Sequence, residues 1–202
     1  MSFTELTAAE AASGVRVATS ADIDVVAETL ADAFTDYSWT RWALPADSYQ
    51  DRLRAMQRYF TERVGLPYGR VHIVDGGTAA AVWTLPDTAI DPQVFVAPEL
   101  LELYGERLSA GAEADAVLAG HRPDRPCWFL ATVGVRGRDQ GKGLGSRVLA
   151  PGLRAARESG HAAFLETSER RNVDFYERLG FTVTAEVDLP GDAPRTWCML
   201  RE

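Results

Sequence analysis

The spacing of apolar residues along the chain predicts an alternation of strands and helices. Residues 23–34 and 48–64 carry apolar side chains at intervals of three and four, which is typical of amphipathic helices. A third helix is predicted over residues 99–118. Short apolar runs predict strands at residues 15–18, 70–74, 78–84, 128–135, 161–167, 181–187 and 195–200. This order is typical of an α/β domain, which we expect to span residues 15–202 after a loose N-terminal arm of residues 1–14.

Two stretches interrupt this pattern. Residues 36–47 hold three large aromatic residues and predict a loop, which either covers the core or forms one wall of a substrate pocket. Pro151-Gly152 lies inside the helix that is predicted for residues 146–157. Because proline removes a backbone hydrogen bond and clashes one turn back, we expect a kink or a break there.

The strand predicted at residues 128–135 leads into a glycine-rich turn. Three glycines alternate with Lys142 and Leu144 over residues 141–145, just before the next helix. Such a turn can hold an anion, because glycine lets the backbone approach a phosphate and the helix N-terminus carries partial positive charge. A Walker loop would need a glycine where Arg136 stands, and the dinucleotide fingerprint G-x-G-x-x-G does not fit the spacing. Neither motif is therefore present.

Two motifs resemble those of the GCN5-related N-acetyltransferase (GNAT) superfamily. Arg138-x-x-Gly141-x-Gly143 is similar to its pyrophosphate loop. Asn172-x-x-x-Tyr176, followed by Gly180-Phe181, is similar to its late asparagine–tyrosine motif, and one predicted strand separates the two motifs. The resemblance implies an α/β fold with a mixed central sheet, a splayed pair of parallel strands and helices on both faces. It also implies acetyl-CoA (coenzyme A) as the co-substrate.

The resemblance implies roles for individual residues. Tyr176 would protonate the departing thiolate, and Asn172 would contact the coenzyme. The other expected coenzyme contacts are Val133, Gly134, Val135, Arg138, Gln140, Gly141, Lys142, Gly143, Leu144, Gly145 and Ser146. A backbone N–H near residues 133–135 would stabilise charge on the thioester oxygen. The alternative for Tyr176 is a packed helix tyrosine beside Phe175.

Further stretches, among them residues 128–135, 163–168 and 175–185, resemble a group within the superfamily that acetylates puromycin. This resemblance implies that the acceptor is a primary amine of puromycin or a related aminonucleoside, with antibiotic resistance as the consequence. Another small amine or an amino-acid derivative is the alternative acceptor. A second alternative is a non-catalytic module that only binds acetyl-CoA, although such a module would have no need of Tyr176.

An acceptor amine requires a base, because an alkylammonium has a pKa of about 10 and is protonated near neutral pH. Glu166 is the first candidate, since a carboxylate in an otherwise apolar strand is uncommon unless it is paired. The alternative is a strand-end glutamate that pairs with Arg170 or Arg171. The residues that we expect to contact the acceptor are Asp36, Tyr37, Trp83 and Glu166.

Composition and charge narrow the class of partner. The 202 residues carry a formal net charge of −8, which argues against nucleic acid or an anionic membrane as the main partner. Cys127 and Cys198 lie in apolar runs, which favours buried free thiols, and no Cys/His spacing indicates a metal site. Without a signal-peptide pattern or a run of transmembrane length, we expect a cytoplasmic protein. The oligomeric state stays open, and a homodimer through the terminal hairpin is one option.

Overall fold

The computed structural model of the chain describes residues 8, 12 and 14–202. Within these residues, one seven-stranded sheet runs in the order β1-β2-β3-β4-β5-β7-β6. Neighbouring strands are antiparallel except for β4 and β5, which are parallel. The strands are β1 (Val15–Val17), β2 (Gly69–Val74), β3 (Ala79–Thr84), β4 (Cys127–Val135), β5 (Ala162–Thr167), β6 (Thr182–Val187) and β7 (Thr196–Arg201). The predicted mixed sheet is confirmed, whereas the arm predicted for residues 1–14 lies almost entirely outside the described residues.

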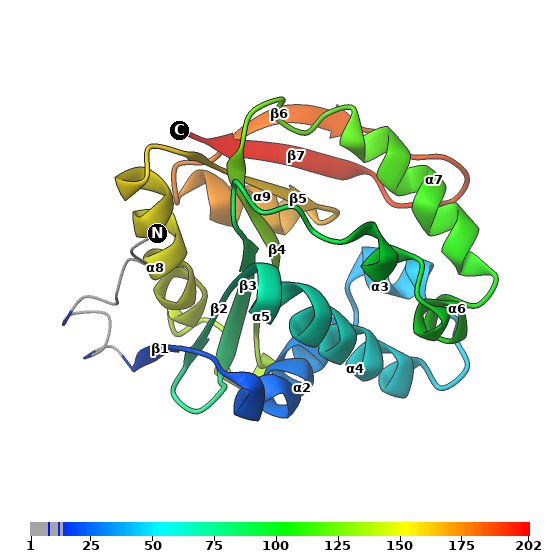
Figure 1. Cartoon of the computed structure of the whole chain (residues 1–202), viewed down its shortest axis with the longest axis horizontal. Helices are drawn as coiled ribbons and strands as arrows, with labels where there is room; N and C mark the ends of the chain where they lie inside the picture. Colours follow the sequence, from blue (N-terminus) through cyan, green and yellow to red (C-terminus); the bar gives the residue numbers. More distant parts are fainter. Residues whose placement is uncertain (1–7, 9–11, 13) are drawn as a thin grey trace.

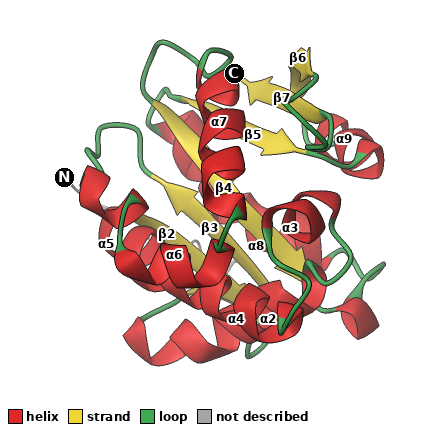
Figure 2. Cartoon of the chain, turned by 90° about the vertical axis from the view of Figure 1, so that its right-hand side faces the viewer, coloured by secondary structure: helices red, strands yellow, loops and turns green. Residues whose placement is uncertain are grey.

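Helices cover both faces of the sheet, as Figure 1 and Figure 2 show. On one face, α8 (Leu144–Glu158) and α9 (Arg170–Glu177) share a core with the strands. On the other face, α2 (Ile23–Ala33) and α7 (Arg107–Ala119) contact the strands, and α4 (Tyr49–Phe60) packs on α2. The remaining helical segments are η1 (Ser20–Asp22), α3 (Ser38–Ala43), η2 (Thr61–Gly65), α5 (Leu66–Tyr68), η3 (Pro92–Phe95), α6 (Pro98–Tyr104) and η4 (Gly137–Asp139).

The parallel strands β4 and β5 are paired along only part of their length. The pairing of β4 with β5 ends at Leu130 and Leu165. Just beyond it, Ala131 is left without a partner on β3, because the register between β3 and β4 shifts between Val82 and Trp83. Such a bulge bends its strand, so the second half of β4 turns away from β5. This is the splayed pair that the sequence predicts.

Some helices differ from the sequence prediction. The loop predicted at residues 36–47 contains the short helix α3. The single helix predicted for residues 99–118 is two helices, α6 and α7, which part at Gly105, where φ is +52°. Glycine reaches this backbone conformation without the steric penalty of a side chain, and it commonly ends a helix. The helix predicted for residues 48–64 begins as α4 and ends as the π-helix η2.

The helix that follows the glycine-rich turn, α8, is continuous through Pro151-Gly152, so of the predicted kink or break the break is wrong. Both residues are buried against the sheet. Gly152 allows the helix to lie directly on the Trp83 indole, where an added Cβ would overlap the ring. The buried contact between helix and sheet therefore outweighs the backbone hydrogen bond that the proline removes.

The described residues contain no helix that is both long and apolar enough to cross a bilayer. They also bring no three His, Cys, Asp or Glu side chains together in a way that could hold a metal ion. Cys198 is a buried free thiol, as predicted, and burial raises its pKa to about 11. Cys127 is only half-buried, which differs from the prediction.

Candidate active site

The glycine-rich turn joins the end of β4 to the N-terminus of α8. Gly141 and Gly143 have φ values of +76° and +75°, which glycine adopts without strain. A Cβ added to either residue would meet no other atom within 4 Å, so the space above the turn is open. α8 begins at Leu144, and its first amides have no helical carbonyl one turn earlier to accept their hydrogens. The turn therefore offers backbone donors to an anion.

Two cations lie beside this turn. Lys142 Nζ is 2.8 Å from Asp139 Oδ1, and Arg138 Nε is 3.5 Å from Asp139 Oδ2. The hydrogen bond from Lys142, more than the contact with Arg138, lowers the pKa of Asp139. The side chains of Arg138 and Lys142 are 77% and 59% exposed. Both can therefore turn toward a phosphate bound on the loop.

The strand end that precedes the turn is held by α2 and by the loop itself. A Cβ at Gly134 would lie 2.6 Å from Ala33 Cβ, so the close approach of α2 and β4 requires a glycine. Gln140 Nε2 donates to the carbonyl of Val135 at 3.3 Å. Val133 is part of the wall of a large cavity. The predicted coenzyme residues of β4 and of the turn therefore form one continuous stretch.

Helix α9 carries Asn172 and Tyr176 one turn apart, so both lie on the same face of the helix. Asn172 Nδ2 donates to Thr167 Oγ1 at 3.1 Å. Tyr176 is buried, and this burial, together with the nearby Tyr37, raises the pKa of its hydroxyl well above the usual range. The phenol stays protonated at neutral pH and can serve as a proton donor.

A cavity of about 800 Å³ lies beside the opening between β4 and β5. Its walls come from α9 on one face of the sheet and from α3, α4 and α7 on the other, with the splayed part of β4 between them. Aromatic side chains form much of the lining: Phe34, Tyr37, Trp39, Phe60, Phe95, Tyr104, Phe129 and Phe164. The charged residues among the described lining are Asp115, Arg122 and Glu166. The cavity is thus largely apolar with one charged cluster.

This charged cluster joins α7 to the end of β5. Arg122 donates from Nε to Glu166 Oε1 at 2.8 Å and from Nη2 to Glu166 Oε2 at 3.2 Å. The same Nη2 lies 2.5 Å from Asp115 Oδ1. Burial acts to lower the pKa of Arg122, but the bonds to Glu166 and Asp115 prevail and raise it. Two carboxylates around one guanidinium leave a net negative charge in the cavity.

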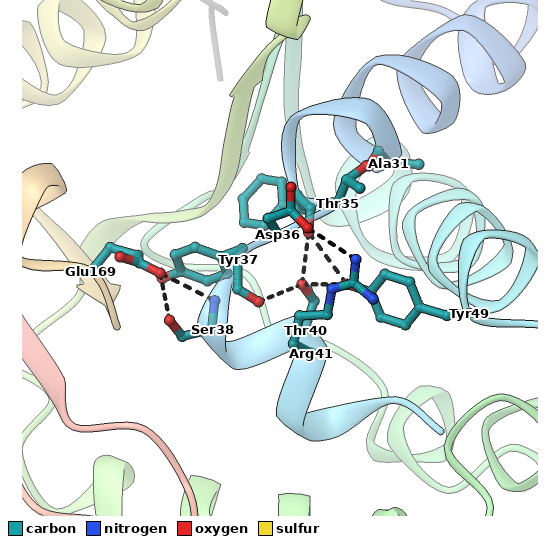
Figure 3. A network of polar contacts seen from close by, with 10 residues as sticks. Ala31, Thr35, Asp36, Tyr37, Ser38, Thr40, Arg41, Tyr49 and Glu169 are labelled. Carbon is teal, nitrogen blue, oxygen red and sulfur yellow. Dashed lines mark hydrogen bonds and ion pairs between the residues drawn. The ribbon is translucent and has the colours of Figure 1, made fainter. Parts of the chain in front are cut away.

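Tyr37 joins the start of α3 to the end of β5. Its hydroxyl accepts a hydrogen bond from the N–H of Ser168 at 2.7 Å and lies 3.2 Å from Thr167 Oγ1. The next residue, Ser38, donates from its N and its Oγ to Glu169 Oε1, at 3.2 and 2.5 Å, as Figure 3 shows. Burial raises the pKa of the Tyr37 hydroxyl. Residues far apart in the sequence therefore meet at the cavity wall.

The motifs and this geometry agree with comparisons against known proteins. The model of the acetyltransferase (GNAT) family matches residues 104–181, which include the glycine-rich turn, Asn172 and Tyr176. A Corynebacterium glutamicum structure, described as histone acetyltransferase HPA2 and related acetyltransferase, is 26% identical and superposes with a TM-score of 0.73 over 93% of this chain and 94% of its own. Over these residues the chain is similar to the GNAT acetyltransferase family, and its fold is similar to that of the solved acetyltransferase.

Two further proteins are similar to this chain over a shorter stretch or at lower identity. An uncharacterised N-acetyltransferase of Schizosaccharomyces pombe is 32% identical over 69 residues, which cover 34% of this chain and 28% of that protein. The structure of the polyamine N-acetyltransferase of Drosophila melanogaster superposes with a TM-score of 0.63 and 15% identity, over 92% of this chain and 97% of its own chain. At that identity the likeness shows the fold alone. The family uses acetyl-CoA as its co-substrate.

Two residues that we expected at the acceptor wall of this GNAT fold are not there. Trp83 is fully buried in the core, where it contacts α8 and forms an edge-to-face pair with Trp128. Its neighbour in sequence, Val82, faces the cavity instead, because successive strand residues point to opposite faces. Asp36 is 85% exposed and pairs with Arg41 at 2.9 Å (Figure 3). Only Tyr37 and Glu166 of the expected acceptor residues line the cavity.

Sequence reasoning missed the partner of Glu166. The alternative to a base at this position was a pair with Arg170 or Arg171, but Arg170 pairs with Asp174, and Arg171 lies near Glu169. Arg122, 44 residues before Glu166, is the true partner. Arg122 lies in a proline-rich stretch, which carries no signal for a distant carboxylate. Thr167 was also missed, because its importance comes only from its bonds to Asn172 and Tyr37.

Proposed function

We propose that this protein transfers the acetyl group of acetyl-CoA to a primary amine on a small molecule with an aromatic body. One observation carries the proposal: a buried phenol, Tyr176, and a net negative cluster of Asp115, Arg122 and Glu166 line the same largely apolar cavity, which also holds several aromatic side chains. A cationic amine with an apolar body is complementary to such a cavity in both charge and polarity.

The donor half of the reaction would use the glycine-rich turn. The pyrophosphate of acetyl-CoA fits the open space above Gly141 and Gly143, where free amides of α8 and the cations Arg138 and Lys142 surround it. Beyond Leu130, β4 has no partner on its β5 side, so its backbone groups there are free to bond the pantetheine arm. The same edge can donate an N–H to the thioester oxygen.

The chemical step breaks the C–S bond of the thioester and forms a C–N bond. The neutral amine attacks the acetyl carbon, and the amine loses a proton to a base. The thiolate that leaves takes the proton of the Tyr176 hydroxyl. Because Tyr176 is buried and its pKa is raised, its hydroxyl is protonated when the substrates bind and has a hydrogen to give to the departing sulfur. Glu166 is the candidate base, acting directly or through a water molecule.

Puromycin or a related aminonucleoside is the narrower form of this proposal. Puromycin carries its free amine next to an aromatic amino-acid side chain and has a heterocyclic base as a second flat group. The aromatic lining of the cavity and its volume of about 800 Å³ suit two such groups. The sequence resemblance described above supports the same acceptor. A simpler arylalkylamine or an amino-acid amide would satisfy the same charge and polarity.

The test is an assay of thiol release from acetyl-CoA with puromycin and a panel of simple amines as acceptors. We expect fast turnover of puromycin and slower turnover of arylalkylamines, and we expect Tyr176→Phe to lower kcat about a hundredfold. Tyr59→Phe is the matched control, because it removes a tyrosine hydroxyl that bonds the carbonyl of Val94 outside the cavity lining.

The possible outcomes separate the parts of the proposal. Turnover of simple amines without puromycin would retain the acetyltransferase and reject the narrower acceptor. Binding of acetyl-CoA without turnover of any amine would instead indicate a module that only binds the coenzyme. Full turnover by Tyr176→Phe would remove Tyr176 as the acid while leaving the reaction in place.

A further inference from the structure

The hydroxyl groups of Tyr37 and Thr167 form a small hydrogen-bonded unit in the cavity wall. Tyr37 Oη and Thr167 Oγ1 are 3.2 Å apart, and either can be the donor. The N–H of Ser168 donates to Tyr37 Oη at 2.7 Å, and Asn172 Nδ2 donates to Thr167 Oγ1 at 3.1 Å. Both hydroxyls therefore already receive one hydrogen bond from outside the pair.

Counting hydrogens shows what this unit can still do. The two hydroxyls carry two hydrogens, and the bond between them uses one. If Thr167 donates to Tyr37, the Tyr37 hydrogen is left over; if Tyr37 donates to Thr167, the Thr167 hydrogen is left over. In the first arrangement the Ser168 side chain lies within reach of the Tyr37 hydrogen; in the second the Thr167 hydrogen has no hydrogen-bond acceptor among the described residues. The pair can thus donate one further hydrogen bond to a group bound in the cavity, in competition with Ser168 when the hydrogen belongs to Tyr37.

The residues around the Tyr37–Thr167 pair indicate that its remaining hydrogen can reach a ligand in the cavity. Tyr37, Thr167, Asn172 and Tyr176 all line the cavity. Asn172 contacts Thr167 and lies one helical turn from Tyr176, so the unit lies beside the proposed proton donor. Burial keeps Tyr37 protonated, so the unit acts as a donor and not as a base.

The segment that carries Tyr37 is held firmly, as Figure 3 shows. Thr40 Oγ1 donates to the carbonyl of Tyr37 at 3.0 Å, and the Tyr49 hydroxyl donates to Thr40 Oγ1 at 3.1 Å. Ser38 donates twice to Glu169. A donor that is fixed before the reaction begins stabilises developing charge without a cost of reorientation.

We propose that the Tyr37–Thr167 pair donates its remaining hydrogen to the acetyl-transfer centre, where it stabilises the negative charge that develops on the thioester oxygen or on the departing sulfur. The inference rests on the proposed function and adds a second donor to Tyr176. No proton is transferred and no covalent bond changes at the pair. Its hydrogen bond strengthens as charge builds and weakens when the product leaves.

The decisive experiment compares Tyr37→Phe, Thr167→Val and the double variant in steady-state kinetics. The single variant that removes the owner of the free hydrogen should lower kcat about a hundredfold, and the other should lower it less. The double variant should fall at least as far as the worse single variant. A double variant that keeps kcat within about twofold of the wild-type value would overturn the proposal.

Two controls separate this role from a structural one. Thr167→Ser keeps the hydroxyl and should restore most of kcat. Tyr59→Phe removes another tyrosine hydrogen bond, to the carbonyl of Val94 at 2.7 Å, on a residue outside the cavity lining. It should lower the melting temperature and leave kcat unchanged. If the fall in kcat of the double variant were fully explained by its smaller fraction of folded protein, the role of the pair would be structural and the proposal would fail.

A titration of bound coenzyme A tests the pair without turnover. If the hydrogen is aimed at sulfur, the thiol of bound coenzyme A should titrate at a higher pH in the double variant, as followed by ultraviolet absorbance of the thiolate. An unchanged titration together with a lowered kcat assigns the hydrogen to the thioester oxygen. If the wild-type protein acetylates no amine, the proposed function fails. If, in addition, the thiol of bound coenzyme A titrates at the same pH in the wild-type protein and the double variant, the proposed hydrogen-bond donor fails as well.

Discussion

Glu166 shows how one residue in the cavity depends on its neighbours. Its two oxygens accept from Arg122, which is shared with Asp115. A carboxylate in a bidentate pair keeps lone pairs that can still accept a proton from an amine or a water molecule. The pairing therefore orients Glu166 toward one side of the cavity, and it does not by itself exclude the role of base.

At the residue scale we predict that Glu166→Gln lowers kcat/KM for an amine about 10- to 100-fold. The loss should be largest at low pH, because the amine is then almost entirely protonated and depends most on a base. A pH–rate profile between about pH 6 and pH 9 measures this. Glu186→Gln is the control, since Glu186 pairs with Arg195 on the surface at 2.7 Å. An unchanged profile for Glu166→Gln would remove it as the base.

At the scale of elements, the glycine-rich turn and α8 act as one binding unit. The turn needs a left-handed backbone at Gly141 and Gly143, and the helix begins immediately after it. These two requirements bring free amides to the open side of the turn. The unit is local in sequence, and so the sequence alone predicts it.

We predict that Gly143→Ala raises the KM for acetyl-CoA about tenfold. The methyl group would enter the open space above the turn, and the left-handed backbone would cost about 1 kcal/mol. Gly191→Ala is a matched control: its φ is +65°, a Cβ there also meets nothing within 4 Å, and it lies in the terminal hairpin. Gly191→Ala should lose similar stability with no change in KM. Equal KM values for the two variants would show that the turn does not hold the coenzyme.

The contact between α8 and β3 gives a second prediction at this scale. Gly152→Ala should destabilise the fold by about 1–3 kcal/mol, because the methyl group would overlap the buried Trp83 ring. Gly111→Ala, in α7, should instead stabilise by about 0.5–1 kcal/mol, since a Cβ there has free space and alanine favours the helix. Urea denaturation of both variants measures the difference. A neutral Gly152→Ala would mean that α8 can move away from the sheet.

At the scale of the whole molecule, the cavity is closed by parts of the chain that lie far apart in the sequence. Asp192, in the turn between β6 and β7, accepts from Trp42 Nε1 of α3 at 2.8 Å and pairs with Arg107 of α7 at 3.3 Å. The bond from Trp42, more than Arg107, lowers the pKa of Asp192. One side chain thus links the terminal hairpin to α3 and α7, two of the helices that line the cavity.

We predict that Asp192→Ala raises the KM for the acceptor amine several-fold and leaves the KM for acetyl-CoA unchanged, because only the acceptor wall loses a link. In the wild-type protein the bonds of Asp192 to Trp42 and Arg107 are fully present above the ordinary pKa of an aspartate, and they weaken as pH falls through the lowered pKa of Asp192. The link is therefore intact in assays at neutral pH. Asp188→Ala, in the exposed pair with Arg195, is the control. Equal rises in both KM values would indicate a general loss of structure.

The order of strands and helices could be predicted from the sequence, because apolar periodicity is a local property. The strands at residues 70–74 and 128–135, and the helix over 23–34, lie within one or two residues of their predicted limits. The glycine-rich turn and the Asn172–Tyr176 pair could also be predicted, since each acts over a few adjacent residues. These features indicated the fold, which the structure confirms, and the resemblance to GNAT acetyltransferases on which the proposed co-substrate rests.

The tertiary structure alone decided which side chains share the cavity. It paired Glu166 with Arg122 and joined Tyr37 to Thr167, and it placed Trp83 in the core and Asp36 in solvent. It also kept α8 intact at its proline, because packing on the sheet outweighed the local penalty. Contacts of this kind join residues that lie 44 to 130 positions apart, and the local sequence pattern carries no information about which of them meet.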